Sequence, residues 1–420
     1  MNILVFEDEG VEQLFPITTG RPAYAITCAS YQLIDWLTRL SDNVVGSVRS
    51  YLELIQTLDF PALSHQLDMS RRWTLVVNAR LVPSVSNFRR IEALLGDLRD
   101  EGSMTGQVQR DGWSIAFALL PTEALVNAER GQLVQSIAEA CANLQKTGSD
   151  GEAVQLYQYP HDVVRANLEH FDANLEYRIA NQPYREIAEN VFVASGVEMH
   201  EFVVTDTTAG PIVIDENTTI GPFCFLKGPI YIGPNCRLNE HAAVKDSTTI
   251  SHTTKIGGEV ESCVIESFTN KQHHGFLGHC YLGSWINLGA GTCNSDLKNT
   301  YGQVNMTYGN EKVPTGMQFV GCIMGDYAKT AINTSIFTGK VIGTCSMVYG
   351  FVTTNVPSFV NYARSFGQVT ELPPAVMIST QQRMFGRRDV EQRPVDVQLL
   401  KEMYERTKRE RQLSEEPLIL

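Results

Sequence analysis

The hydrophobic positions in the second half of the chain recur with a period of six. Aliphatic residues follow this period without a break at Ile214, Ile220, Leu226, Ile232, Leu238, Val244, Ile250 and Ile256. Four positions after the first seven stand six small or short side chains and one isoleucine: Thr218, Cys224, Ile230, Cys236, Ala242, Thr248 and Thr254. An α-helix would give a period of about 3.6 and a half-buried strand a period of about two. A period of six is typical of a parallel β-helix, in which each face of a coil turns one large side chain inward and small residues fill the corners.

We therefore predict a parallel β-helix from about Val191 to about Gly350. Each coil buries its core only by stacking on its neighbours, so several coils must be present. The period breaks after Ile256 and resumes at Leu282 and again at Ile336. Residues 293–316 form a Gly- and Asn-rich insertion that is too polar for a coil. Such insertions leave a β-helix as loops on one face, which is often the binding face.

The first 185 residues alternate apolar strands with helical patterns, which favours an α/β domain with a largely parallel sheet covered by helices. The expected strands are 2–6, 73–78 and 113–120, and the expected helices are 24–40, 87–98 and 163–181. A Pro- and Arg-rich tail ends in an amphipathic helix, 395–411, which is expected to cap the last coil or to pack on a neighbouring subunit. The predicted domains are 1–185, 190–370 and 371–420.

The net charge of −13, from 34 basic and 47 acidic residues, argues against nucleic acid or an anionic membrane as the main partner. The chain opens with MNILVFEDEG, which lacks the basic and apolar regions of a signal peptide. No apolar run approaches the roughly 20 residues that span a bilayer. The nine cysteines stand singly, without a CxxC pair, and are expected to be reduced. These features predict a cytoplasmic enzyme or assembly protein.

The order of an α/β domain and a six-residue repeat resembles the bifunctional N-acetylglucosamine-1-phosphate uridyltransferase/glucosamine-1-phosphate acetyltransferase family. The likeness is strongest in HHGFLGHCYLGSWINLGAGTCNSDLK, residues 273–298, and weaker over residues 220–233 and 324–343. The chain also resembles a divergent branch of sugar nucleotidyltransferases. The resemblance implies a left-handed β-helix, a homotrimer, and acetyl-CoA bound between neighbouring β-helices.

The resemblance also implies a catalytic base. In the family pattern the catalytic histidine precedes a Leu-Gly pair by four and five residues, which here gives His273 before Leu277 and Gly278. A histidine is suited to take the proton of an attacking amine, an effect typically worth about 10²–10⁴ in rate. His274 is the alternative if the loop register shifts by one. A solvated or structural histidine pair is the other interpretation.

Two asparagines and a glycine-rich turn complete the expected acetyltransferase site. Asn287 and Asn294 match the family's asparagines that bind the sugar and its amine. Gly289, Ala290 and Gly291 allow the backbone to approach a ligand closely, and in the family an N–H group here faces the acyl oxygen of acetyl-CoA.

Two lysines match the family's phosphate ligands, and three positions depart from its pattern. Lys245 and Lys298 stand where the family binds the sugar phosphate. Cys263 stands where another phosphate-binding lysine is expected, and Phe276 and Ser295 replace tyrosines. These departures predict an altered acceptor.

The first domain has fewer features of a nucleotidyltransferase than the β-helix has of an acetyltransferase. Residues 14–22, LFPITTGRP, resemble the family's loop after the first strand, which implies that Arg21 binds nucleotide phosphate. Arg80 stands at the position of the family's metal-binding aspartate, and an arginine cannot ligate Mg²⁺. Mg²⁺ would then depend on one of the carboxylates of Glu7, Asp8 and Glu9. Two alternatives stay open: nucleotidyl transfer with Mg²⁺, and a remnant domain kept for assembly or for binding a sugar nucleotide.

The sequence thus predicts a transferase that N-acetylates an amino-sugar phosphate, with nucleotidyl transfer to a sugar 1-phosphate as a second activity. A β-helical zinc carbonic anhydrase, which binds zinc through three histidines across a subunit interface, is an alternative, with His274 and His279 as ligands and His241 or His252 as the third. A non-catalytic trimeric scaffold that binds a sugar nucleotide is another alternative.

Overall fold

The computed structural model describes residues 1–100, 107–112, 114–125, 132–142, 144–146 and 154–412. The chain forms two compact units. Unit 1 comprises residues 1–14, 21–26 and 31–158, and unit 2 comprises residues 15–20, 27–30 and 159–420. Trp113, the expected first residue of a strand, lies outside the described residues. The domain boundaries 1–185, 190–370 and 371–420 stay a prediction.

Unit 1 contains a six-stranded sheet in the order β2-β1-β3-β5-β4-β6. Its strands are β1 (Asn2–Phe6), β2 (Val44–Ser47), β3 (Trp73–Asn78), β4 (Gln107–Asp111), β5 (Ser114–Pro121) and β6 (Gln145–Lys146). Strand β1 pairs in parallel with β2 and β3, and β4 with β6, whereas β5 is antiparallel to both β3 and β4. The sheet is therefore mixed, and β4 and β5 form an antiparallel hairpin within it.

The helices of unit 1 are α1 (Leu33–Leu40), α2 (Glu53–Asp59), α3 (Val85–Asp100) and α4 (Leu133–Ala140), with 3₁₀ turns at Glu9–Leu14, Ala23–Ala25, Ser50–Leu52 and Thr122–Leu125. The helix expected over 24–40 is wrong in its first half. Ala29 and Ser30 have φ angles of 44° and 74°, which an α-helix does not allow. Residues 27–30 belong to unit 2, so the chain leaves unit 1 there before α1 begins.

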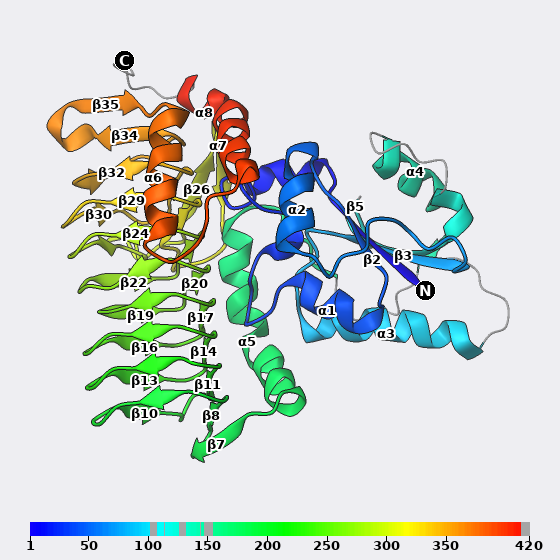
Figure 1. The fold of residues 1–420 in the computed structure, drawn as a ribbon, viewed down its shortest axis with the longest axis horizontal. Helices are drawn as coiled ribbons and strands as arrows, with labels where there is room; N and C mark the ends of the chain where they lie inside the picture. Colours follow the sequence, from blue (N-terminus) through cyan, green and yellow to red (C-terminus); the bar gives the residue numbers. More distant parts are fainter. Residues whose placement is uncertain (101–106, 113, 126–131, 143, 147–153, 413–420) are drawn as a thin grey trace. The chain divides into compact units, whose positions relative to one another are not determined.

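Unit 2 is a parallel β-helix with three faces, and its coils stack along one axis (Figure 1). Face 1 contains β8 (Val191–Val193), β11 (Ile212–Ile214), β14 (Ile230–Ile232), β17 (Thr248–Ile250), β20 (Val264–Ile265), β23 (Tyr281–Leu282), β28 (Cys322–Met324) and β31 (Lys340–Ile342). Face 2 contains β9 (Glu198–Met199), β12 (Thr219–Ile220), β15 (Arg237–Leu238), β18 (Lys255–Ile256), β21 (Asn270–Lys271), β24 (Asn287–Leu288), β29 (Lys329–Thr330), β32 (Met347–Val348) and β34 (Val360–Ala363). Face 3 contains β10 (Val204–Asp206), β13 (Phe225–Lys227), β16 (Ala243–Lys245), β19 (Glu259–Glu261) and β22 (Phe276–Gly278), followed by β25 (Cys293–Asn294), β30 (Ser335–Ile336) and β33 (Phe351–Val352).

The aliphatic residues of the six-residue repeat form the core of this β-helix. All eight, from Ile214 to Ile256, have 0% exposed surface and belong to one buried cluster. These residues lie on the three faces in turn. Burying one such side chain contributes roughly 1.5–3 kcal/mol, so together they are a large part of the stabilisation. The predicted β-helix is confirmed.

The period breaks after Ile256 because the coils change length. Ile230 pairs with Thr248, but Thr249 pairs with Val264, so the second of these coils is three residues shorter. A later coil contains the predicted insertion, in which β26 (Asn305–Tyr308) and β27 (Glu311–Pro314) form an antiparallel hairpin.

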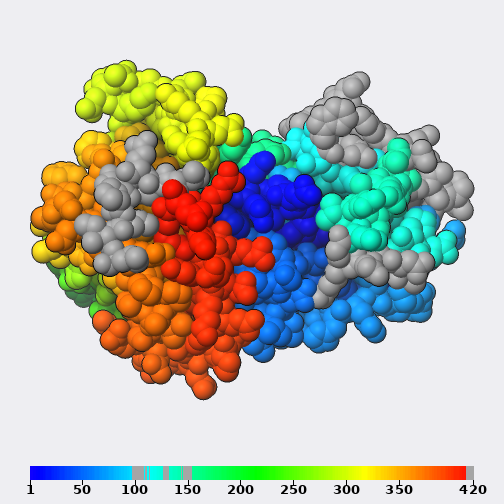
Figure 2. Space-filling view, turned by 90° about the horizontal axis from the view of Figure 1, so that it is seen from above, coloured from blue at the N-terminus to red at the C-terminus, as the bar shows by residue number. Residues whose placement is uncertain are grey.

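Helices and two terminal strands complete unit 2. Helix α5 (His161–Asn181) precedes β7 (Arg185–Ala188), which is antiparallel to β8, and β35 (Gln368–Glu371) is antiparallel to β34. The tail forms α6 (Pro374–Gly386), α7 (Pro394–Arg406) and α8 (Lys408–Gln412), and the first two lie side by side on the surface (Figure 2). Glu410 of α8 accepts a hydrogen bond from the N–H of Ser358, so α8 contacts the last coil.

Candidate active site

The predicted catalytic histidines lie at the corner between faces 2 and 3. His273 and His274 follow β21 and precede β22, and both are exposed. The same corner of the next coil carries Gly289, Ala290 and Gly291. The N–H of Gly291 donates to the carbonyl oxygen of His274 at 3.0 Å. The structure therefore brings the predicted base and the glycine-rich turn together on adjacent coils.

Gly291 is required at this corner by space and by backbone conformation. Its φ is 75°, which favours glycine. A Cβ atom there would lie 2.1 Å from Oδ1 of Asn333 and 3.4 Å from Nε2 of His274. The ring of His274 thus lies beside the glycine backbone.

One N–H group of the glycine-rich turn is available to a ligand. The N–H of Gly289 donates to the carbonyl of Thr330 at 3.1 Å, and that of Gly291 is bonded to His274. Within the described residues, the N–H of Ala290 has no acceptor. A backbone donor that is free at this corner can stabilise negative charge on an acyl oxygen.

A buried lysine, Lys271, lies beneath the histidines. It pairs with Ile256 in the register of face 2, so it takes an inward position of the repeat, and it has 2% exposed surface. Its Nζ donates to the carbonyl oxygens of Gly257 and His273, both at 2.7 Å. The sequence signal for it was a lysine six residues after Ile265, where an aliphatic residue would continue the period.

We expect Lys271 to make stability depend on pH. Burial lowers its pKa to about 8, whereas an unfolded lysine has a pKa of about 10.4. Between these values the unfolded chain binds more protons, so the free energy of unfolding rises with pH from about 8 to 10.4, by up to about 3 kcal/mol. In Lys271→Met this rise should be smaller by that amount. Urea unfolding at pH 7.5 and 10 measures it, and an equal rise in both proteins would refute the role of this charge.

The structure places the two predicted asparagines on different faces. Asn287 is exposed on face 2, in register with Asn270 and Lys329. Asn294 is 4% exposed, and its Oδ1 accepts from the N–H of Gly278 at 2.9 Å while its Nδ2 donates to the carbonyl of Gly278 at 3.0 Å. The side chain of Asn294 therefore joins neighbouring coils of face 3.

Both predicted phosphate ligands have other partners. The Nζ of Lys245 lies 2.7 Å from Glu259 and 3.0 Å from Glu261. Burial lowers the pKa of Lys245, but these two carboxylates outweigh it and the net pKa is raised. Lys298 donates to the carbonyl oxygen of Gln303 at 2.9 Å, within its own loop.

The structure adds a histidine-aspartate pair that the sequence reasoning missed. Nδ1 of His279 lies 2.9 Å from Oδ2 of Asp296, and the ring stacks on Phe319 with centroids 5.2 Å apart. A carboxylate on Nδ1 fixes the ring and leaves Nε2 for proton transfer. The pair lies at the corner after β22. The sequence feature that could have indicated it is the spacing of 17 residues between His279 and Asp296, which is close to the length of one coil.

The residues of the zinc alternative do not meet within one chain. His274 and His279 lie at the two ends of β22, on different corners. In the part of the chain that the structure describes, no group of three His, Cys, Asp or Glu side chains could hold a metal ion.

In unit 1, two carboxylates after β1 are paired with arginines. Asp8 accepts from Nε and Nη2 of Arg80, both at 2.7 Å, and Arg80 is 1% exposed. Glu7 accepts from Nε of Arg49 at 2.9 Å. Arg21 is half-buried, and its carbonyl oxygen accepts from Nη2 of Arg49 at 2.9 Å. A Mg²⁺ ion needs free carboxylate oxygens, so Glu7 and Asp8 do not fit one in this arrangement.

Comparison with known proteins finds a family model that matches unit 1 and α5. Residues 3–182 match the family described as "Sugar nucleotidyl transferase". A "Bifunctional protein GlmU" of Synechococcus elongatus is 29% identical over 154 residues, which are 37% of this chain and 26% of that protein. A "Bifunctional sugar-1-phosphate nucleotidylyltransferase/acetyltransferase" of Sulfurisphaera tokodaii is 26% identical over 33% of this chain and 35% of that protein. The chain is similar to these bifunctional proteins over part of its length, and it spans between a quarter and about a third of the two relatives.

A solved structure of Francisella novicida UDP-N-acetylglucosamine acyltransferase aligns with 52% of this chain and 87% of its own, at 16% identity and a TM-score of 0.24. This alignment is too weak to support a fold assignment. The fold of unit 2 is assigned from the pairing of its own strands. Among the described residues, no helix is long and apolar enough to cross a membrane.

Proposed function

We propose that this protein is a cytoplasmic transferase that acetylates the amine of an amino-sugar phosphate at the corner between faces 2 and 3. The observation that supports it most is the N–H of Ala290, which has no acceptor within the described residues and stands one coil from His273 and His274. The relatives whose names include acetyltransferase support the same reaction.

In this proposal the amine nitrogen attacks the thioester carbonyl of acetyl-CoA, and the C–S bond breaks to release CoA. His273 accepts the proton that the amine loses and passes it on to the CoA thiolate or to solvent. The N–H of Ala290 donates to the acyl oxygen as negative charge develops on it. Lys271 holds the carbonyl oxygen of His273 and so positions the base.

The test is a panel of amino-sugar phosphates offered with acetyl-CoA, with release of the CoA thiol as the readout. Amine-dependent release supports the proposal. If no member of the panel releases CoA, acetyl transfer is wrong and the non-catalytic scaffold is the better description.

For unit 1 we propose binding of a sugar nucleotide without Mg²⁺-dependent nucleotidyl transfer. The ion pairs of Asp8 with Arg80 and of Glu7 with Arg49 support this, because they use two of the three carboxylates that could hold a metal there and leave only the exposed Glu9. Pyrophosphate release from a nucleoside triphosphate and a sugar 1-phosphate, measured with and without Mg²⁺, tests it. Mg²⁺-dependent release would contradict it.

The homotrimer is also a proposal, and an exposed aromatic stack on the same corner supports it. Phe202 and Phe223 are 66% and 53% exposed and stack with centroids 5.1 Å apart, and His241 continues the stack. Exposed apolar patches of this kind are typical of interfaces.

We expect the double variant Phe202→Ser, Phe223→Ser to dissociate the trimer, because it removes two rings that a neighbouring subunit would cover. Sedimentation velocity measures the mass. Leu54→Ser in unit 1, at a side chain 58% exposed, is the matched control and should keep the mass of the wild type. A monomeric wild type, or a double variant with unchanged mass, would contradict this interface.

A further inference from the structure

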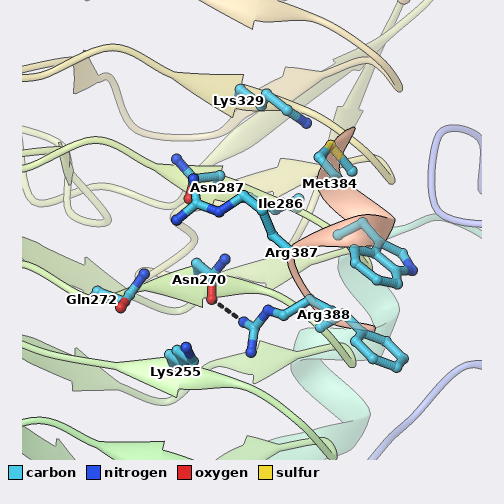
Figure 3. Close-up of a pocket in the computed structure, with 11 residues that line it drawn as sticks. Lys255, Asn270, Gln272, Ile286, Asn287, Lys329, Met384, Arg387 and Arg388 are labelled. Atoms are coloured by element: carbon cyan, nitrogen blue, oxygen red, sulfur yellow. Dashed lines mark hydrogen bonds between the residues drawn. The ribbon is translucent and has the colours of Figure 1, made fainter. Parts of the chain in front are cut away.

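Unit 2 contains a second site of convergent polar groups, a pocket of about 220 Å³ where face 2 meets the end of α6 (Figure 3). Lys255, Asn270, Asn287 and Lys329 line it from four successive strands, in register. Parallel strands lie about 4.8 Å apart, so these side chains form a ladder. Arg387 and Arg388 extend over the ladder from the other side, as Figure 3 shows.

The charges of this pocket are all of one sign. Four of its lining side chains are cations, and no carboxylate is among the described residues that line it. The chain as a whole carries a net charge of −13, so the cluster is not a consequence of composition. Like charges that are held close without a counter-ion repel one another.

Burial lowers the pKa values of three of these cations, and neighbouring cations add to the shift of Lys255 and Arg388. Burial, followed by the charges of Arg388, Arg237 and Arg387, lowers the pKa of Lys255. Burial lowers the pKa of Lys329 to about 8, and burial together with Arg387 lowers that of Arg388. An anion in the pocket would oppose each of these shifts, because it favours the charged form of its partners.

The fold holds the arginines in place against this repulsion. Nη2 of Arg388 donates to Oδ1 of Asn270, as the dashed line in Figure 3 marks. Phe385, in the last turn of α6, packs on Trp285 with ring centroids 4.4 Å apart, and Trp285 stacks on Phe268 at 4.2 Å. The aromatic contacts fix the end of the helix, so the cationic groups are positioned before any ligand arrives.

We propose that this pocket binds the phosphate groups of a ligand that carries at least two negative charges there, through Lys255, Lys329, Arg387 and Arg388. Arginine and lysine are the usual phosphate ligands, and the amides of Asn270 and Asn287 add neutral donors. Sites that enclose a whole drug-sized ligand measure about 300–1,000 Å³, so this smaller pocket suits a phosphate or diphosphate group with the rest of the ligand outside. Lys245 is paired with two carboxylates. Within the described residues none of the four pocket cations has a carboxylate partner, although Lys329 donates to the carbonyl oxygen of Tyr327 at 3.0 Å. The sequence reasoning did not identify these four cations.

Calorimetric titration of the full chain with inorganic pyrophosphate tests the site without any turnover, so it succeeds or fails independently of acetyl transfer. We expect binding that weakens as salt is added. Lys329→Gln and Arg388→Gln should each weaken it at least tenfold, whereas Lys329→Arg should retain it. Lys312→Gln, at an exposed lysine of β27, is the matched control and should bind as the wild type does. No binding by the wild type, or an equal loss in Lys312→Gln, would overturn the proposal.

Competition then identifies the source of the phosphate. Coenzyme A, uridine diphosphate and glucose 1-phosphate are titrated separately against bound pyrophosphate. Displacement by CoA assigns the pocket to the acyl donor, and displacement by either of the other two assigns it to a nucleotide or a sugar phosphate. Failure of all three to displace pyrophosphate would mean an adventitious ion only, and would overturn the assignment to a phosphorylated ligand.

Discussion

Replacing His273 by alanine is expected to slow amine-dependent CoA release by about 10²- to 10⁴-fold, the usual contribution of a general base. The imidazole stands at an exposed corner, so its loss should leave the coil intact. Its backbone carbonyl, which Lys271 holds at 2.7 Å, is present in the variant as well. Steady-state kinetics with the best acceptor of the panel measure the rate, and thermal unfolding checks the fold. An unchanged rate would exclude His273 as the base.

Three further variants separate His273 from the other histidines of this region. His274→Ala tests the alternative residue of the same corner. His279→Ala and Asp296→Asn test the pair whose atoms lie 2.9 Å apart at the next corner. If His273 is the base, the last two variants should change the rate by less than tenfold. If the large loss follows His279 and Asp296 together, the base is this pair, and the acidic limb of the pH-rate profile should shift in Asp296→Asn.

The inward residues of the β-helix could be predicted because burial imposes a period on the sequence. Ile214 to Ile256 had to be aliphatic, and their spacing gave the fold. The outward residues carry no such constraint, and which of them meet depends on coil length. His279 reaches Asp296, and Lys255 aligns with Asn270, only because the coils here are shorter than eighteen residues. With a constant repeat of eighteen residues, these side chains would be assigned to the wrong coil.

The phosphate pocket could not be predicted from the sequence for a related reason. Its arginines come from the tail, more than a hundred residues after Lys255, and the contact of Phe385 with Trp285 brings them over face 2. The amphipathic pattern predicted a helix over 395–411, but it did not indicate what the preceding segment covers. The same holds for the first domain. Arg80 could be recognised from the sequence as a departure from the family pattern, but its partner Asp8 could not, because it lies 72 residues away in sequence.

Replacing Arg80 by methionine is expected to lower the free energy of unfolding of unit 1 by about 3–5 kcal/mol, the usual result of breaking a buried ion pair on one side. Arg80 is 1% exposed, and the side chain of Asp8 is 15% exposed. Without the guanidinium, Asp8 keeps the hydrogen bond from Nδ2 of Asn78 at 2.8 Å but loses both arginine donors. The carbonyl oxygen of Tyr157, which accepts from Nη1 of Arg80 at 2.7 Å, also loses its donor. Urea unfolding followed by far-UV circular dichroism measures the change.

The double variant Asp8→Leu, Arg80→Met distinguishes loss of the pair from loss of packing. A buried charge that has lost its partner is the main penalty in Arg80→Met, so removing the carboxylate as well should recover most of the stability. A hydrophobic pair of similar volume often replaces a buried ion pair without net loss. If the double variant is instead less stable than Arg80→Met, the packing and the bond to Tyr157 are the main contributions of Arg80. In that case the Asp8 carboxylate does not depend on Arg80 for its stability. The ion pair would then no longer be an argument against a metal ion at the end of β1.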